Sequence, residues 1–172
     1  MYEIGSLVIY RSEGVCVVSD IREESFGTIG EKEKYYILMP VNDEKSTLFV
    51  PLNNEKLCSM IRVLLSADEI MSLCDELRDT RFEWIEDNRS RNTYFKDLLS
   101  VGDRRDVIVI VNTICDRIKQ MNNSGKKVTG TDENTLYRAV KMLYDEFKVT
   151  TDISSEADII PLLCGELKLA EK

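Results

Sequence analysis

The feature that most constrains the fold is a change in the spacing of apolar residues near residue 60. Before this point they come in short β-branched runs separated by glycine, proline and polar turns, which is typical of strands. After Ser66 they recur every three or four residues, which is typical of amphipathic helices. We therefore expect an α+β chain, with a β module over residues 1–62 and an all-α helical domain over residues 63–172.

The β module is expected to be a small barrel. Its strands are short and joined by tight polar turns, a pattern that predicts a strongly twisted barrel of the Tudor or SH3 kind. The expected strands are Ser6–Tyr10, Val15–Val18 running on towards Ile21, Lys34–Met39 and Ser46–Val50, with Leu57–Val63 as a candidate fifth strand. An edge strand of such a barrel can pair with a strand of a partner protein, and we nominate residues 47–50. The alternative, that this strand simply closes the sheet, stays open.

The helical domain is expected to contain five helices. Two stretches have the capping-box form, in which a serine or threonine and a glutamate three residues later satisfy each other's backbone donors. The helices are expected to begin at Ser66, at Thr80, after Asp103, at Thr131 and at Ser154. The β-branched run Val107–Val111 favours a strand by propensity. Because apolar residues continue at helical spacing to Met121, we expect a helix with a buried face instead.

The single tryptophan, Trp84, lies among arginines in an otherwise acidic chain. In a helix that begins at Thr80, the residues Arg81, Trp84, Asn88 and Arg91 share one face. Such a face predicts an exposed tryptophan, and arginines beside an aromatic ring suit nucleic acid through phosphate charge and base stacking. Two alternatives stay open: the ring fills a core, and the arginines pair with neighbouring carboxylates on a solvated face.

The composition excludes several classes of protein. A net charge of −8 argues against a protein that coats nucleic acid, although residues 81–130 carry 10 basic and 7 acidic side chains. Histidine is absent, which excludes Ser-His-Asp and Cys-His catalysis and disfavours a transition-metal site. The five scattered cysteines indicate buried thiols in a reducing cytoplasm. We expect no enzyme, no catalytic residues, no cofactor, no metal, no small-molecule ligand and no membrane span.

The order of these parts resembles a known family. The resemblance rests on Ile4–Tyr10, Tyr35–Leu38, Leu48–Asn53, Leu99–Asp103, Leu143–Phe147 and the short final helix. Together they resemble the CarD/CdnL family of bacterial transcription regulators. The N-terminal module of this family is similar to the RNA-polymerase-interacting domain of transcription-repair coupling factors.

The resemblance implies two binding surfaces. The β module would bind the β subunit of RNA polymerase by pairing with an edge strand, and the helical domain would contact promoter DNA at the upstream edge of the transcription bubble, affecting open-complex stability. Trp84 would wedge into the minor groove while basic neighbours hold phosphates. The candidate phosphate contacts are Arg81, Arg89, Arg91, Arg104, Arg105, Lys126 and Lys127.

The candidate polymerase contacts are Phe26, Thr47, Leu48, Phe49 and Val50. Phe26 and Phe49 stand where other family members have arginines, which implies a more apolar contact with the polymerase. Two further departures concern DNA: Trp84 lies about one helical turn earlier than in many members, and Glu133-Asn134 replaces a common basic pair. The alternative function is an acidic adaptor that binds RNA polymerase and another protein without contacting DNA. In either case we expect a cytoplasmic monomer.

Overall fold

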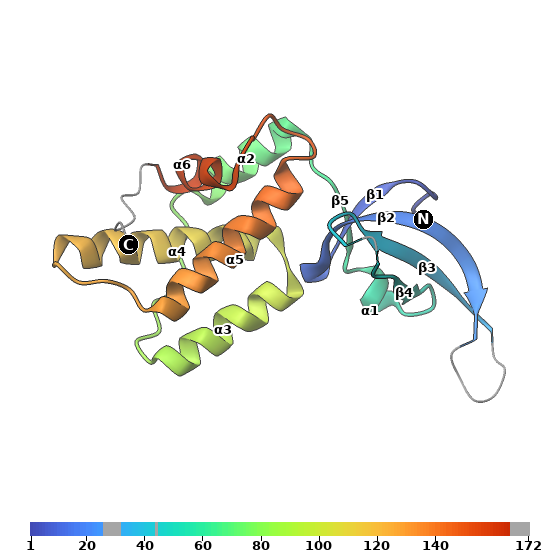
Figure 1. Ribbon diagram of the computed structural model, residues 1–172, viewed down its shortest axis with the longest axis horizontal. Coiled ribbons are helices and arrows are strands. Elements are labelled where there is room, and N and C mark those ends of the chain that lie inside the picture. The colour runs from blue at the N-terminus through green and yellow to red at the C-terminus, as the bar shows by residue number, and fades with distance from the viewer. Residues whose placement is uncertain (26–31, 44, 166–172) are drawn as a thin grey trace. The chain divides into compact units, whose positions relative to one another are not determined.

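The chain divides into two compact units, residues 1–64 and residues 65–172 (Figure 1). The structure is a computed structural model that describes residues 1–25, 32–43 and 45–165. The first unit is built on a five-stranded antiparallel sheet and the second on helices. The prediction of an α+β chain is therefore confirmed.

The sheet of the N-terminal unit has the strand order β4-β3-β2-β1-β5, with every neighbouring pair antiparallel. The strands are β1 (Leu7–Tyr10), β2 (Gly14–Glu24), β3 (Glu33–Pro40), β4 (Leu48–Pro51) and β5 (Ile61–Val63). A register shift between Val18 and Asp20 interrupts the β2–β3 pairing. Such a bulge increases the local twist, and β2 and β3 curve strongly along their length in Figure 1.

One face of this sheet forms the core of the N-terminal unit. Side chains at alternate strand positions are buried together, as the period of a strand requires. This core consists of Val8, Tyr10, Cys16, Val18, Tyr36, Leu38, Val50 and Ile61. The segment expected as a fifth strand is divided: the short helix α1 (Glu55–Cys58), capped by Asn54, precedes β5.

The helical unit is organised around α4, which contacts four other helices. The helices are α2 (Ala67–Leu77), α3 (Asn88–Val101), α4 (Arg104–Asn123), α5 (Gly130–Phe147) and α6 (Ile159–Cys164), with a 3-10 turn η2 (Glu156–Asp158) before α6. Every residue from 107 to 115 is buried, because α2, α3, α5 and α6 surround this part of α4. A helix buried all round needs apolar residues on all its faces. This explains the β-branched run that made a strand plausible.

Side-chain caps begin α1 to α5, and two of the predicted caps, Ser66 and Asp103, are confirmed. Ser66 forms the expected capping box with Glu69, and Asp103 caps α4 through the Arg105 amide. The cap of α5 is Thr129, which forms a box with Asp132. The prediction of Thr131 as this cap was wrong by two residues, because only Thr129 has an acidic partner at the third helical position.

The predicted helix start at Thr80 is wrong. Residues 81–87 are not helical, and α3 begins at Asn88 with Asp87 as its cap. The Phe82 amide donates to the Thr113 hydroxyl of α4 at 2.9 Å, so a tertiary contact meets this backbone donor. Phe82 and Trp84 also pack against the helical core. Arg81, Trp84, Asn88 and Arg91 therefore do not share a helical face.

The two candidate caps can be compared directly. Asp87→Ala removes the side chain that accepts from the Ser90 amide at 2.8 Å, so we expect the melting temperature to fall by roughly 5 °C. Thr80→Ala is the matched control and should leave it unchanged within about 1 °C, because the Thr80 side chain caps no helix. Circular dichroism melts of both variants test this. Equal losses in the two variants would contradict the observed helix start.

Candidate functional site

The first candidate site is the edge of the sheet formed by β4. Among the described residues, β4 pairs with β3 on one side and ends the sheet order on the other. The pairing sets Leu48 opposite Leu38 and Phe49 opposite Ile37. The nominated segment thus lies at an edge of the sheet, and an edge strand is a template for pairing with another chain. Its pairing with a partner stays a prediction.

The side chains of this edge differ in what they present. Thr47 and Phe49 are exposed, and the Phe49 ring lies edge-on to Tyr35 with centroids 6.3 Å apart. Val50 is fully buried in the core of the sheet, so its side chain does not offer the contact expected from the sequence. Phe26 lies outside the described residues. The exposed part of this edge therefore combines an aromatic pair with a polar residue.

The second candidate site is the region around Trp84, where Arg91 holds three segments together. Arg91 is 2% exposed and binds both carboxylate oxygens of Asp132 at 2.9 and 2.8 Å. It also donates to the carbonyls of Ile85 and Glu86 at 2.6 and 3.2 Å. The expected exposure of Arg91 is therefore wrong, because its guanidinium joins α3, α5 and the segment before α3.

The same contacts keep the Asp132 carboxyl group ionised. Burial alone would raise the pKa of Asp132, but the hydrogen bonds from Arg91 and Thr129 outweigh it and lower the pKa below its usual value. A carboxyl whose pKa is lower in the folded state stabilises the fold above its unfolded pKa. That contribution is lost as the pH falls through the lowered value. The helical unit is thus stabilised by this pair at neutral pH and weakened in acid.

Trp84 is half-buried, and two guanidinium groups lie over its ring. The Arg91 guanidinium lies 4.2 Å from the ring centroid and that of Arg117 lies 5.0 Å from it. The ring also packs against the helical core. The predicted exposed stripe is therefore replaced by a ring that is partly core and partly stacked on cations, a contact that stabilises both partners.

Most of the other nominated arginines are held in ion pairs. Arg104 is buried against Glu146 at 3.0 Å, so its expected place at the surface is wrong. Arg81 pairs with Asp116 at 2.6 Å, and Arg105 pairs with Glu76. Arg105 stays exposed within its pair, and the other exposed residues of the nominated set are Arg89, Lys126 and Lys127. Phosphate-binding capacity in this set is thus concentrated at the start of α3 and in the α4–α5 connection.

Sequence reasoning did not single out Asp132 or Arg117. Asp132 stands three residues after Thr129, and that spacing is a capping-box signal. Its second role as the partner of Arg91 has no local signal, because the two residues lie 41 positions apart. Arg117 likewise meets Trp84 and Glu86 only through the packing of the segment before α3 against α4.

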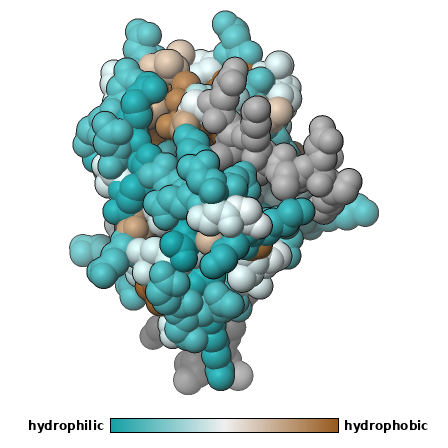
Figure 2. Space-filling model, turned by 90° about the vertical axis from the view of Figure 1, so that its left-hand side faces the viewer, coloured by the Kyte–Doolittle hydropathy of each residue, from teal (hydrophilic) through white to brown (hydrophobic). Residues whose placement is uncertain are grey.

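Two hollows of the helical unit are lined by residues that the structure describes. The first, of about 770 Å³, is lined by α4, α5 and the η2–α6 segment, with Ile118, Leu136 and Val140 among its apolar residues and Lys127 beside them. A ligand bound at Lys127 would therefore meet an apolar surface as well as a cation. The face that carries the α4–α5 connection is mostly hydrophilic, with hydrophobic side chains mainly in its upper part (Figure 2).

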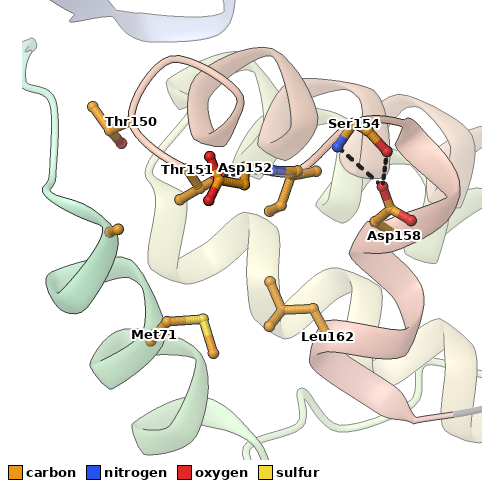
Figure 3. Close-up of a pocket in the computed structure, with 9 residues that line it drawn as sticks. Met71, Thr150, Thr151, Asp152, Ser154, Asp158 and Leu162 are labelled. Carbon is orange, nitrogen blue, oxygen red and sulfur yellow. Dashed lines mark hydrogen bonds between the residues drawn. The ribbon is translucent and has the colours of Figure 1, made fainter.

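The second hollow, of about 650 Å³, lies between α2 and the connection from α5 to α6 (Figure 3). Its hydroxyl groups are used within the protein. Thr150 donates to the Leu65 carbonyl at 2.7 Å, Thr151 to the Phe147 carbonyl at 2.8 Å, and Ser154 to Asp158 at 3.1 Å. These groups hold the connection between α5 and α6 together, which is a structural role.

The geometry defines the N-terminal unit as a small Tudor-like β module with an available edge strand. Residues 2–64 match the family described as CarD-like/TRCF RID domain, and this match ends where the N-terminal unit ends. The unit is therefore a CarD-like/TRCF RID module, which is a non-enzymatic interaction module and indicates interaction with RNA polymerase. No curated protein matches the chain.

Within residues 1–25, 32–43 and 45–165, no group of three or more cysteine, aspartate or glutamate side chains is arranged to hold a metal ion. None of the helices in these ranges is long and apolar enough to cross a membrane.

The Arg91–Asp132 pair supports a stability prediction. Arg91→Ala leaves a buried carboxylate without its partner and frees the segment before α3, so we expect a loss of about 3–5 kcal/mol in the free energy of unfolding. The control is Arg89→Ala, an exposed arginine two residues earlier, which should change stability by less than about 0.5 kcal/mol. Urea unfolding measures both. A small loss in Arg91→Ala would mean that the pair does not hold these segments together.

Proposed function

We propose that the protein is a transcription regulator of the CarD/CdnL kind, with two binding surfaces. The RID module binds the β subunit of RNA polymerase through the β4 edge. The helical unit contacts promoter DNA at the upstream edge of the transcription bubble and affects open-complex stability. The observation that carries the proposal is the family match over residues 2–64, which coincides with the unit that has the exposed edge strand.

Binding at the β4 edge would extend the sheet by one strand. Main-chain hydrogen bonds from β4 to a partner strand would supply affinity, and the side chains beside them would supply specificity. Phe49 and Tyr35 form an aromatic pair on the outer face of this edge, and Thr47 is exposed just before it. An apolar ring in this position suits a partner surface with an apolar side chain rather than a carboxylate.

Phe49→Ala should weaken binding to the isolated lobe of the β subunit by about tenfold or more, because an aromatic anchor at an interface centre typically contributes over 1 kcal/mol. Tyr137→Ala is the control, since Tyr137 is an exposed aromatic residue on α5. Biolayer interferometry with the full chain measures both affinities, and circular dichroism checks that each variant is folded. Unchanged binding of a folded Phe49→Ala variant would place the polymerase contact elsewhere.

The proposed DNA contact is supported by the exposed cations of the helical unit. Arg89 begins α3, and Lys126 and Lys127 lie just before α5. The Arg91–Asp132 pair brings the first turns of α3 and α5 together, so these cations belong to the same end of the helical unit. Trp84 lies next to this pair, stacked on Arg91, and would act at the DNA through the part of its ring that remains exposed.

The adaptor function remains a second candidate, and two observations favour it. Arg81, Arg91, Arg104 and Arg105 are all held in ion pairs, which lowers the charge available for phosphates. The apolar hollow beside Lys127 would also suit a protein side chain better than a phosphate backbone. In this case the helical unit would recruit a second protein to the polymerase.

Salt dependence separates the two candidates. If the helical unit holds phosphates, binding to forked promoter DNA should weaken steeply with salt. Replacing both Lys126 and Lys127 by Gln should reduce the slope of log K against log salt by roughly 2, because each lysine neutralises about one phosphate. Lys141→Gln, an exposed lysine further along α5, should leave the slope unchanged. Fluorescence anisotropy measures these slopes. An absence of DNA binding at low salt would favour the adaptor.

A further inference from the structure

Two cysteines that play no part in the proposed function meet where α6 packs on α4. Cys115 lies in α4 and is fully buried, while Cys164 ends α6 and is half-buried. The Cys164 thiol donates to the Asn112 side-chain oxygen at 3.4 Å. The Asn112 amide is oriented for this contact, because its nitrogen donates to the Leu77 carbonyl at 2.8 Å.

A second contact holds Cys164 on the face of α4 that carries Cys115. The Lys119 ammonium donates to the Cys164 carbonyl at 2.7 Å. Asn112 and Lys119 lie three residues before and four residues after Cys115, so all three share one face of α4. Cys164 is thus bound by residues on both sides of Cys115 along α4, and the two thiols are close enough to shift each other's pKa.

The two thiols have unequal reactivity. The hydrogen bond from Cys115 lowers the pKa of Cys164, and the nearby Lys119 and Arg81 lower it further, against the opposing effects of burial and of Asp116. The same hydrogen bond and burial raise the pKa of Cys115. A thiolate that is accessible and stabilised by cations is the form that reacts with oxidants. Cys164 is also the more exposed of the two thiols, so it is the candidate attacking thiol and the buried Cys115 the candidate resolving one.

We propose that Cys115 and Cys164 form a reversible thiol–disulfide site that ties α6 to α4. With a hydroperoxide as oxidant, the Cys164 thiolate attacks the O–O bond and becomes a sulfenic acid, while the peroxide leaves as water or an alcohol. The Cys115 thiol then displaces water from that sulfenic acid and forms the disulfide. In sum, two thiols are oxidised by two electrons and one peroxide is reduced. Thiol–disulfide exchange with a small-molecule thiol reverses the step.

This disulfide would close a chain loop of about 50 residues and fix the last helix of the described chain to the central helix. Closing a loop of this length restricts the unfolded chain, so oxidation should stabilise the helical unit. Because α6 also contacts α2 and α5, the bond would restrict motion at one side of the whole bundle. The site acts on the helical unit and does not depend on how the RID module binds.

The test uses the full chain treated with hydrogen peroxide, alkylated under denaturing conditions and digested without reductant. We expect mass spectrometry to find the peptides of Cys115 and Cys164 joined with the loss of two hydrogens. The melting temperature should rise by roughly 10 °C and fall again after dithiothreitol. Cys16 and Cys74 should remain alkylatable thiols, since burial raises the pKa of each to about 11.

Two variants make the result specific. Cys164→Ser should abolish both the linked peptide and the rise in melting temperature, whereas Cys74→Ala should retain both. The proposal is overturned if Cys164 oxidises to the sulfinic acid or pairs between molecules while Cys115 remains reduced. A linked peptide without a shift in melting temperature would overturn the stabilising tie. If a variant does not fold, the disulfide-linked peptides of the wild-type chain still test whether Cys115 and Cys164 are joined.

Discussion

The ion pair between Arg91 and Asp132 is the contact on which the helical unit depends most. A guanidinium with almost no exposure is costly unless its donors are satisfied. Here it binds both oxygens of Asp132, two backbone carbonyls and the side chain of Asn88. One side chain thereby connects the starts of α3 and α5 to the segment that crosses α4. The position of Trp84 follows from this arrangement, because its ring stacks on the same guanidinium.

The two units use their polar residues differently. The RID module gathers one cluster of core side chains on one face of a curved sheet and leaves β4 at the end of the strand order. An edge strand of this kind can pair with a partner strand. In the helical unit several arginines form ion pairs with carboxylates of the same unit. These arginines stabilise the fold and are less available to bind a partner.

Local signals account for the parts of the fold that were predicted well. The short β-branched runs form strands. The capping box at Ser66 and the cap at Asp103 each begin a helix. All of these signals depend on residues within four positions of one another. The capping pattern at Thr80 was an equally good local signal and failed. There, the Phe82 amide donates to the side-chain hydroxyl of Thr113 in α4. The packing of Phe82 and Trp84 against the core outweighs the local preference for a helical turn.

The sequence by itself determined the α+β class and the change from β module to helices, because periodicity and turn chemistry are local properties. The tertiary structure placed β4 at the edge of the sheet, a position that the sequence had left open. The tertiary structure decided which charges are available. Arg91 and Arg104 look like surface arginines until Asp132 and Glu146, more than 40 residues away, are placed against them. The meeting of Cys115 with Cys164 is of the same kind. Contacts between distant residues depend on how the helices pack, and packing has no signature in the spacing of neighbouring residues.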